Sequence, residues 1–196
     1  MKINPANVIS VIRVVMIFVA IYLLLEVSTY QGNFAALIII SVAILLDAVD
    51  GKIARMFGYQ DEVGKLTDLY ADHIVANLIW VSLAFLGVVP VWIPLIATTR
   101  DMAVDFFRQV TAIRTGKNGF DQVTSLPLGW LSASRSMRFG YGLLKLGVWA
   151  LALSALYFPI QMMVTYLAWI TLFVCLLRAI PAFQVGWRQV LFIGSE

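Results

Sequence analysis

Charged residues are scarce in this chain of 196 residues. Asp, Glu, Lys and Arg together make up 13% of it, about half of their share in an average soluble domain. So few charges exclude a soluble globular domain and a disordered chain, because both depend on a polar, hydrated surface. The single cysteine, Cys175, cannot form an intrachain disulfide, which excludes a disulfide-stapled scaffold.

Hydrophobic residues dominate instead, at 61% of the chain. A transmembrane helix needs about 20 apolar residues, so this content suffices for about six spans and leaves no room for a separate soluble domain. We therefore expect an all-α integral membrane protein with a single membrane domain over residues 1–196. No signal-peptide cleavage site follows the first apolar run, so residues 1–6 are expected to form a short interfacial stretch.

Six apolar windows, separated by polar or glycine-bearing stretches, predict six transmembrane helices within residues 7–180. The predicted helices are Val8–Val27, Phe34–Phe57, Gly64–Val88, Val91–Thr115, Leu126–Tyr157 and Ile160–Ile180. A C-terminal tail at 181–196 carries Trp187 and Arg188 and is expected to lie along the membrane interface.

The distribution of Lys and Arg predicts the orientation in the membrane. Two connections are basic, with Lys52, Arg55 and Lys65 around the second-to-third connection and Arg108, Arg114 and Lys117 around the fourth-to-fifth. The other three connections contain neither residue. By the positive-inside rule, the basic connections and both termini are cytoplasmic, which requires an even number of spans. The expected location is therefore the cytoplasmic (inner) membrane, crossed several times.

Several cationic residues fall within the predicted spans or near their ends. They are Arg13, Arg100, Arg135, Arg138 and Lys145. A charge in hydrocarbon is unfavourable unless the side chain snorkels to the headgroups, pairs with an acid or lines a wet cavity. Both snorkelling and a functional role stay open for each of them.

Four carboxylates form the sharpest pattern in the sequence. Asp47 and Asp50 lie in the cytoplasmic end of the second predicted helix and share one helical face with positions 51 and 54. Asp68 and Asp72 lie one turn apart on the third. A short turn around residues 58–61 would make the two helices antiparallel neighbours. We therefore expect the four carboxylates to converge.

Divalent cations would relieve the repulsion in such a cluster, because hard oxygen ligands at this density suit Mg²⁺, Mn²⁺ or Ca²⁺. A pair of these ions is suited to binding a pyrophosphate. The small residues Gly51, Ala54 and Gly64 would let a bulky ligand approach the backbone. The alternative is a pair of helices held together by salt bridges. It explains neither why the acids share helical faces nor why small residues lie beside them.

Residues 47–72 resemble, position for position, the signature of the CDP-alcohol phosphatidyltransferases, D-x2-D-G-x2-A-R-x8-G-x3-D-x3-D. The eight fixed positions are Asp47, Asp50, Gly51, Ala54, Arg55, Gly64, Asp68 and Asp72. The resemblance implies six transmembrane helices, usually in a homodimer, with a site open to the cytoplasm. The specific motif spans only this stretch of the chain.

The resemblance also implies roles for these residues. Two divalent cations, Mg or Mn, would bind the pyrophosphate of a CDP-linked lipid and be held by Asp47, Asp50, Asp68 and Asp72. The implied contacts to the CDP-lipid are Gly51, Ala54, Arg55 and Gly64, with Asn7 and Ser10. Asp72 would be the catalytic residue, taking the proton from the acceptor hydroxyl as that oxygen attacks the phosphate next to the lipid and CMP leaves.

The acceptor alcohol is indicated by weaker features. Residues 7–13 (N-x2-S-x2-R) resemble the N-x2-T-x2-R opening of the phosphatidylglycerophosphate synthase branch. Arg100-Asp101 followed by Arg108 resembles its R-E-x6-R, with Asp in place of Glu. These two arginines share a helical face, and with Arg135 they could form a cationic pocket for a phosphate on the acceptor. Glycerol 3-phosphate is therefore our first choice, with CDP-diacylglycerol as donor.

Other interpretations stay open. The branch usually has L-D-P-x-A-D-K around the last two acids, whereas this chain lacks the proline and has His73 in place of the lysine. Inositol phosphate or another polyol phosphate could be the acceptor, an archaeal-type lipid the donor, and His73 either a packing residue or an acceptor contact. A non-catalytic scaffold and an ion-binding transporter are the rival classes, but purely apolar residues beyond Asp47 and His73 leave the transporter no obvious ion path.

Overall fold

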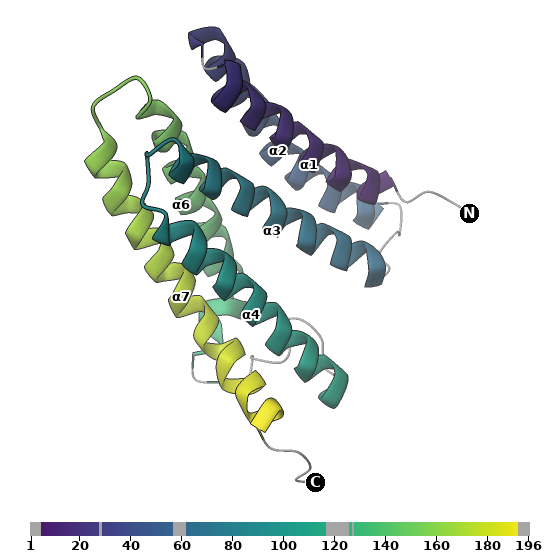
Figure 1. Cartoon of the computed structure of the whole chain (residues 1–196). Coiled ribbons are helices and arrows are strands. Elements are labelled where there is room, and N and C mark those ends of the chain that lie inside the picture. Colours follow the sequence, from purple (N-terminus) through teal and green to yellow (C-terminus); the bar gives the residue numbers. More distant parts are fainter. Residues whose placement is uncertain (1–4, 28, 57–61, 117–125, 127, 192–196) are drawn as a thin grey trace. The chain divides into compact units, whose positions relative to one another are not determined.

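The computed structural model describes residues 5–27, 29–56, 62–116, 126 and 128–191 (Figure 1). Within these ranges, the side chains of residues 5, 6, 47–56, 62, 63, 65, 135 and 138 lie outside the description. The described residues are helical almost throughout and contain no strand, which confirms the all-α prediction for them. They divide into two compact units, Met1–Gly87 and Val88–Glu196.

The described part of the first unit comprises three long helices and one short π-helix. Helix α1 (Pro5–Tyr22) continues into the π-helix η1 (Leu23–Val27), after which α2 (Tyr30–Met56) runs back along α1 (Figure 1). Helix α3 (Glu62–Phe85) follows, and α1 packs against both α2 and α3. Small side chains make this packing close, since Ala20, Ala36 and Ala43 are fully buried.

The second unit is built around its last helix. Helix α7 (Gln161–Leu191) packs against α4 (Trp92–Thr115) and α6 (Arg135–Ser154), and the single turn α5 (Trp130–Ala133) contacts α6 and α7. The core between α4 and α7 contains Val104, Ala179 and Ala182, with Phe183 against them.

Most helix boundaries lie within a few residues of the predicted ones, and two departures are larger. The predicted fifth helix is interrupted at Ser134, whose backbone is extended and whose hydroxyl accepts a hydrogen bond from the Met137 amide (3.5 Å), so that a new helix begins at Arg135. Helix α7 continues through Pro181 to Leu191, where a tail was predicted. It stays helical because its apolar stripe goes on, with Ala182 and Gly186 buried like Ala179 one turn earlier.

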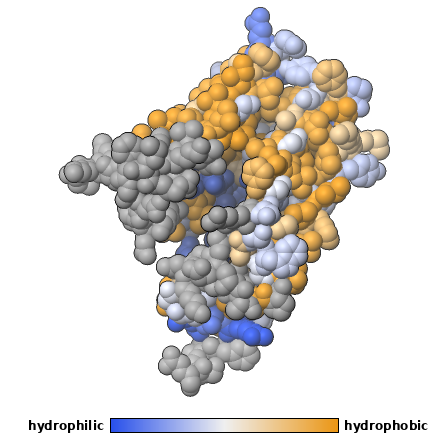
Figure 2. All heavy atoms as spheres, turned by 180° about the vertical axis from the view of Figure 1, so that it is seen from behind, coloured by the Kyte–Doolittle hydropathy of each residue, from blue (hydrophilic) through white to orange (hydrophobic). Residues whose placement is uncertain are grey.

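Among the described residues, two stretches are long and apolar enough to cross a membrane, Asn7–Val27 and Gln161–Leu191. Tyr30–Leu46 and Phe139–Ser154 are shorter apolar helices. Large hydrophobic side chains are exposed on every long helix, and apolar residues cover much of the face seen in Figure 2. Such a surface is unfavourable in water and suits contact with lipid. The prediction of six spans stays a prediction, because only two stretches of the described residues meet this criterion.

Candidate active site

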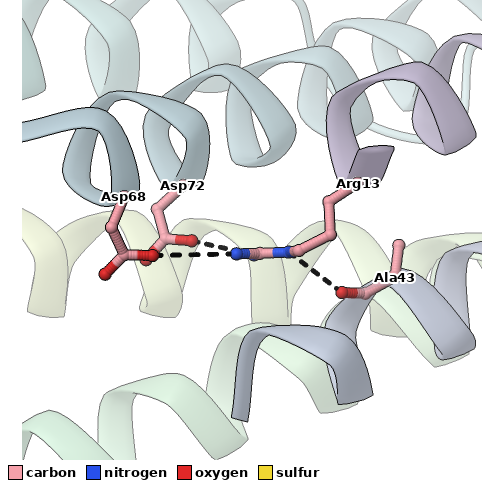
Figure 3. Close-up of polar contacts among 4 residues, drawn as sticks. All are labelled: Arg13, Ala43, Asp68 and Asp72. Atoms are coloured by element: carbon pink, nitrogen blue, oxygen red, sulfur yellow. Dashed lines mark hydrogen bonds and ion pairs between the residues drawn. The ribbon is translucent and has the colours of Figure 1, made fainter. Parts of the chain in front are cut away.

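The last two acids of the signature meet at one guanidinium (Figure 3). Arg13 on α1 donates a hydrogen bond from Nη2 to Oδ1 of Asp72 at 2.8 Å, and its Nη1 lies 3.9 Å from Oδ1 of Asp68. Asp68 and Asp72 are one turn apart on α3, so both carboxylates reach the same partner. The helix phase expected from the sequence thus brings these two side chains together.

Arg13 is held from a second side as well. Its Nε donates to the carbonyl oxygen of Ala43 on α2 at 3.1 Å. The side chain is only 3% exposed, and Ser10, one turn earlier on α1, is also buried. The option that Arg13 snorkels to the headgroups is therefore wrong, because its charge is directed inward, where two acids and a carbonyl compensate it.

The two carboxylates themselves are accessible. Their side chains are 51% (Asp68) and 42% (Asp72) exposed, although their common partner is buried. They offer hard oxygen ligands at positions that an ion can reach, which fits a divalent cation such as Mg²⁺ or Mn²⁺. Gly64 lies on the same helix, one turn before Asp68, and is half-buried. His73 follows Asp72 and is also half-buried.

The other half of the signature lies on α2. Helix α2 includes Asp47, Asp50, Gly51, Ala54 and Arg55, but the side chains of these residues lie outside the described residues. Within the described residues there is no group of three or more His, Cys, Asp or Glu side chains arranged to hold a metal. The convergence of all four acids therefore stays a prediction, and the structure describes two of them.

The second unit contains the arginines expected to bind a phosphate. Arg100 donates a hydrogen bond from Nη1 to Oδ1 of its neighbour Asp101 at 2.7 Å, and both side chains are largely buried. The Nε of Arg100 is buried without a hydrogen-bond partner among the described residues. Arg108 lies within electrostatic range of Arg100 and of the carboxylate of Asp105. Arg135 begins α6, and its side chain lies outside the described residues.

A further arginine joins this group, and sequence reasoning did not include it. Arg178 on α7 also lies within electrostatic range of Arg108. Its Nε donates to the carbonyl oxygen of Leu131 at 3.3 Å, and its guanidinium lies over the ring of Tyr141, 4.6 Å from the ring centroid. No local spacing could have indicated it, because the packing of α7 against α4 and α6 brings it there.

The sequence as a whole matches one family. Residues 3–177 match the profile of the CDP-alcohol phosphatidyltransferases. The protein belongs to this family. CDP-alcohol phosphatidyltransferases are membrane-bound and generally depend on divalent metals.

Curated proteins with three different names match parts of this chain. A Mycobacterium tuberculosis protein named "Probable phosphatidylglycerophosphate synthase" is 30% identical over 115 residues, which cover 58% of this chain and 54% of the relative. The "Cardiolipin synthase (CMP-forming)" of Streptomyces coelicolor is 27% identical over 97 residues, 48% of this chain and 45% of the relative. The "Archaetidylinositol phosphate synthase" of Aeropyrum pernix is 38% identical over 61 residues, 31% of each chain. The first-named match thus spans about half the length of its relative.

Proposed function

We propose that this protein is a metal-dependent phosphatidyltransferase of phospholipid biosynthesis. It transfers the phosphatidyl group of CDP-diacylglycerol to an alcohol and releases CMP. The observation that carries the proposal is the meeting of Asp68 and Asp72 at accessible positions on α3, in a chain that contains every fixed position of the family signature. Acids that only stabilise the packing of a helix pair would not require all the fixed positions of the signature.

The acids would hold two divalent cations, Mg or Mn, through Asp47, Asp50, Asp68 and Asp72. When bound, these cations neutralise the pyrophosphate charge of the donor and stabilise the charge that develops on the leaving group. The CDP-lipid would lie against Gly51, Ala54, Arg55 and Gly64, with Asn7 and Ser10 contributing from α1. The donor chemistry and exposure of Asp68 and Asp72 support this assignment.

Asp72 acts as the general base. Its carboxylate accepts the proton of the acceptor hydroxyl, and the alcohol oxygen forms a bond to the phosphorus next to the lipid. The bond from that phosphorus to the bridging oxygen breaks, and CMP leaves with the electron pair. The half-exposed carboxylate can receive the proton on its outer side, while its inner side is bonded to Arg13. A positioned base of this kind contributes about 10²–10⁴-fold to the rate.

Glycerol 3-phosphate is the proposed acceptor, with Arg100, Arg108 and Arg135 binding its phosphate. The unpartnered, buried Nε of Arg100 supports this assignment, because a guanidinium is a good donor to phosphate oxygens. The relative named as a phosphatidylglycerophosphate synthase also favours this acceptor. Inositol phosphate or another polyol phosphate is the second candidate, favoured by the relative named as an archaetidylinositol phosphate synthase.

In the membrane, we propose six spans with the termini and both basic connections on the cytoplasmic side, and a homodimer as the assembly. The exposed apolar side chains and the two candidate spans support membrane insertion.

Cysteines introduced by Thr115→Cys and Phe158→Cys in a Cys175→Ala background test the orientation in sealed vesicles. A membrane-impermeant thiol reagent should label position 158 only from outside the cell and position 115 only from the cytoplasm. Equal labelling of both from one side would contradict the orientation.

An acceptor panel tests the reaction itself. Purified protein, CDP-diacylglycerol and Mg²⁺ are combined with glycerol 3-phosphate, inositol phosphate, phosphatidylglycerol, inositol or serine, and CMP release is measured. The proposal expects the highest kcat/KM with glycerol 3-phosphate. A preference for inositol phosphate would establish the second candidate. No CMP release with any acceptor would favour a non-catalytic membrane protein.

A further inference from the structure

Arg13 is the one buried cation on α1 within the described residues of the first unit. Helix α1 carries no other charged residue, and burying a guanidinium beside it is unfavourable unless several partners compensate the charge. The partners that the described residues supply come from two different helices and are a backbone carbonyl of α2 and two carboxylates of α3. To neutralise the charge of Arg13 alone, one acid would be enough.

The position of each partner relates to the signature. Ala43 lies one turn before Asp47 on α2, and in a regular α-helix its carbonyl is also the acceptor for the amide of residue 47. Asp68 and Asp72 are the signature acids of α3. Arg13 is thus bonded immediately next to one half of the signature and directly to the other half (Figure 3).

The packing of the first unit gives the contacts of Arg13 their importance. Helix α1 packs against both α2 and α3, the two helices on which the signature is divided. A planar guanidinium has donors in fixed directions, so its contacts define an angle and a distance between the groups it joins. Sliding α3 along α1 by one residue would remove Asp72 from the 2.8 Å hydrogen bond.

We propose that Arg13 is a positioning residue, which fixes the carboxylates of Asp68 and Asp72 relative to the signature segment of α2. This rests on the proposed function, because it assigns a purpose to the acids that the reaction would use. The guanidinium acts through these acids and touches neither substrate. Its geometry matters as well as its charge, because an ammonium group cannot donate to Ala43 and to Asp72 in the same arrangement while it also pairs with Asp68.

Arg13→Lys is the decisive variant, because it keeps the positive charge and removes the planar guanidinium with its fixed donor directions. A purely electrostatic or packing role predicts wild-type behaviour once the variant folds. Positioning predicts that Mn²⁺, titrated and followed by EPR, binds about 10-fold more weakly, as is typical when a residue supporting metal ligands is replaced. It also predicts a kcat about 100-fold lower, with KM for both substrates changed much less, because a misplaced base slows the chemical step.

Arg114→Lys is the matched control, since Arg114 is exposed at the end of α4 and the replacement is the same. Thermal unfolding in detergent shows that each variant is folded, and Arg13→Gln serves as a second variant if the lysine destabilises the protein. Wild-type Mn²⁺ affinity and kcat in Arg13→Lys would overturn the proposal, as would wild-type protein that binds no Mn²⁺. Wild-type protein that binds Mn²⁺ but releases no CMP would instead refute the proposed function, and the Mn²⁺ comparison would still decide the role of Arg13.

Discussion

The carboxylate of Asp72 accepts a 2.8 Å hydrogen bond from Arg13, a residue 59 positions earlier in the chain. The two partners differ sharply in environment, because the arginine side chain is 3% exposed and the aspartate side chain 42%. One side of the carboxylate is therefore fixed from the protein interior while the other is open to a ligand. A general base that must meet a substrate hydroxyl in one orientation requires this combination.

Replacing Asp72 with asparagine should slow turnover strongly and leave substrate binding largely intact. The Asp72→Asn variant keeps the shape and the acceptor oxygen of the side chain but cannot take up a proton. We expect kcat to fall by about 10²–10⁴-fold, the usual contribution of a general base. CMP release measures kcat, and binding of CDP-diacylglycerol with Mn²⁺ is measured separately.

The control for this variant is Glu26→Gln, which makes the same carboxylate-to-amide change at an exposed acid in the π-helix that follows α1. It should leave kcat unchanged. Normal turnover in Asp72→Asn would remove Asp72 from the base role, even if the rest of the proposal stands.

Chelation of divalent cations should stop the reaction. The carboxylates of Asp68 and Asp72 cannot bind a pyrophosphate by themselves, because like charges repel. We expect EDTA to reduce CMP release to background, and an excess of Mg²⁺ or Mn²⁺ to restore it. Undiminished rates in the chelator, after dialysis against it, would rule out the two-cation account.

The arginines of α4 should affect the acceptor selectively. Removing one charged hydrogen-bond partner of a phosphate weakens binding by about 1.5–3 kcal/mol, or about 10–150-fold. Arg100→Ala and Arg108→Ala should therefore raise KM for glycerol 3-phosphate by this factor and change KM for CDP-diacylglycerol much less. Steady-state kinetics with each substrate varied in turn measures both values.

Arg114→Ala provides the comparison, because Arg114 is exposed on the same helix, near its C-terminal end. Its KM values should match those of the wild type. An equal rise of both KM values in the Arg100 or Arg108 variant would argue against a phosphate pocket for the acceptor and favour a structural role for these arginines.

Gly186 is required by the packing of α7 against α4. A Cβ atom at this position would overlap the side chain of Phe107, with its Cγ only 2.6 Å away. We expect Gly186→Ala to lower the free energy of unfolding by about 1–3 kcal/mol, the typical effect of overpacking. Thermal unfolding in detergent measures the change.

Gly147→Ala on α6 is the matched variant, because a Cβ built there meets no atom of the described residues within 4 Å beyond its own stretch of helix. Alanine is favoured over glycine inside a helix by about 0.5–1 kcal/mol, so this variant should be as stable as the wild type or slightly more stable. A destabilised Gly147→Ala together with an unaffected Gly186→Ala would contradict the described packing.

Local pattern alone was enough to predict the helices and the phase of the signature acids. Apolar runs bounded by polar stretches define where α1 to α4 lie, because hydropathy and helix periodicity act over a few turns. The spacing of Asp68 and Asp72 likewise predicted one shared face, and both reach Arg13. The ends of helices were predicted less well, since the cap at Ser134 and the continuation of α7 past Pro181 depend on local backbone geometry and packing.

The amino-acid sequence by itself determined the helical class, the apolar surface and the identity of the acids, because each of these depends on residues close together in the chain. Tertiary structure alone decided that Arg13 turns inward to Asp72 and that Arg178 of α7 comes within electrostatic range of Arg108. The reason is physical: a buried charge takes its partners from whichever helices pack around it, and those partners lie far away in sequence.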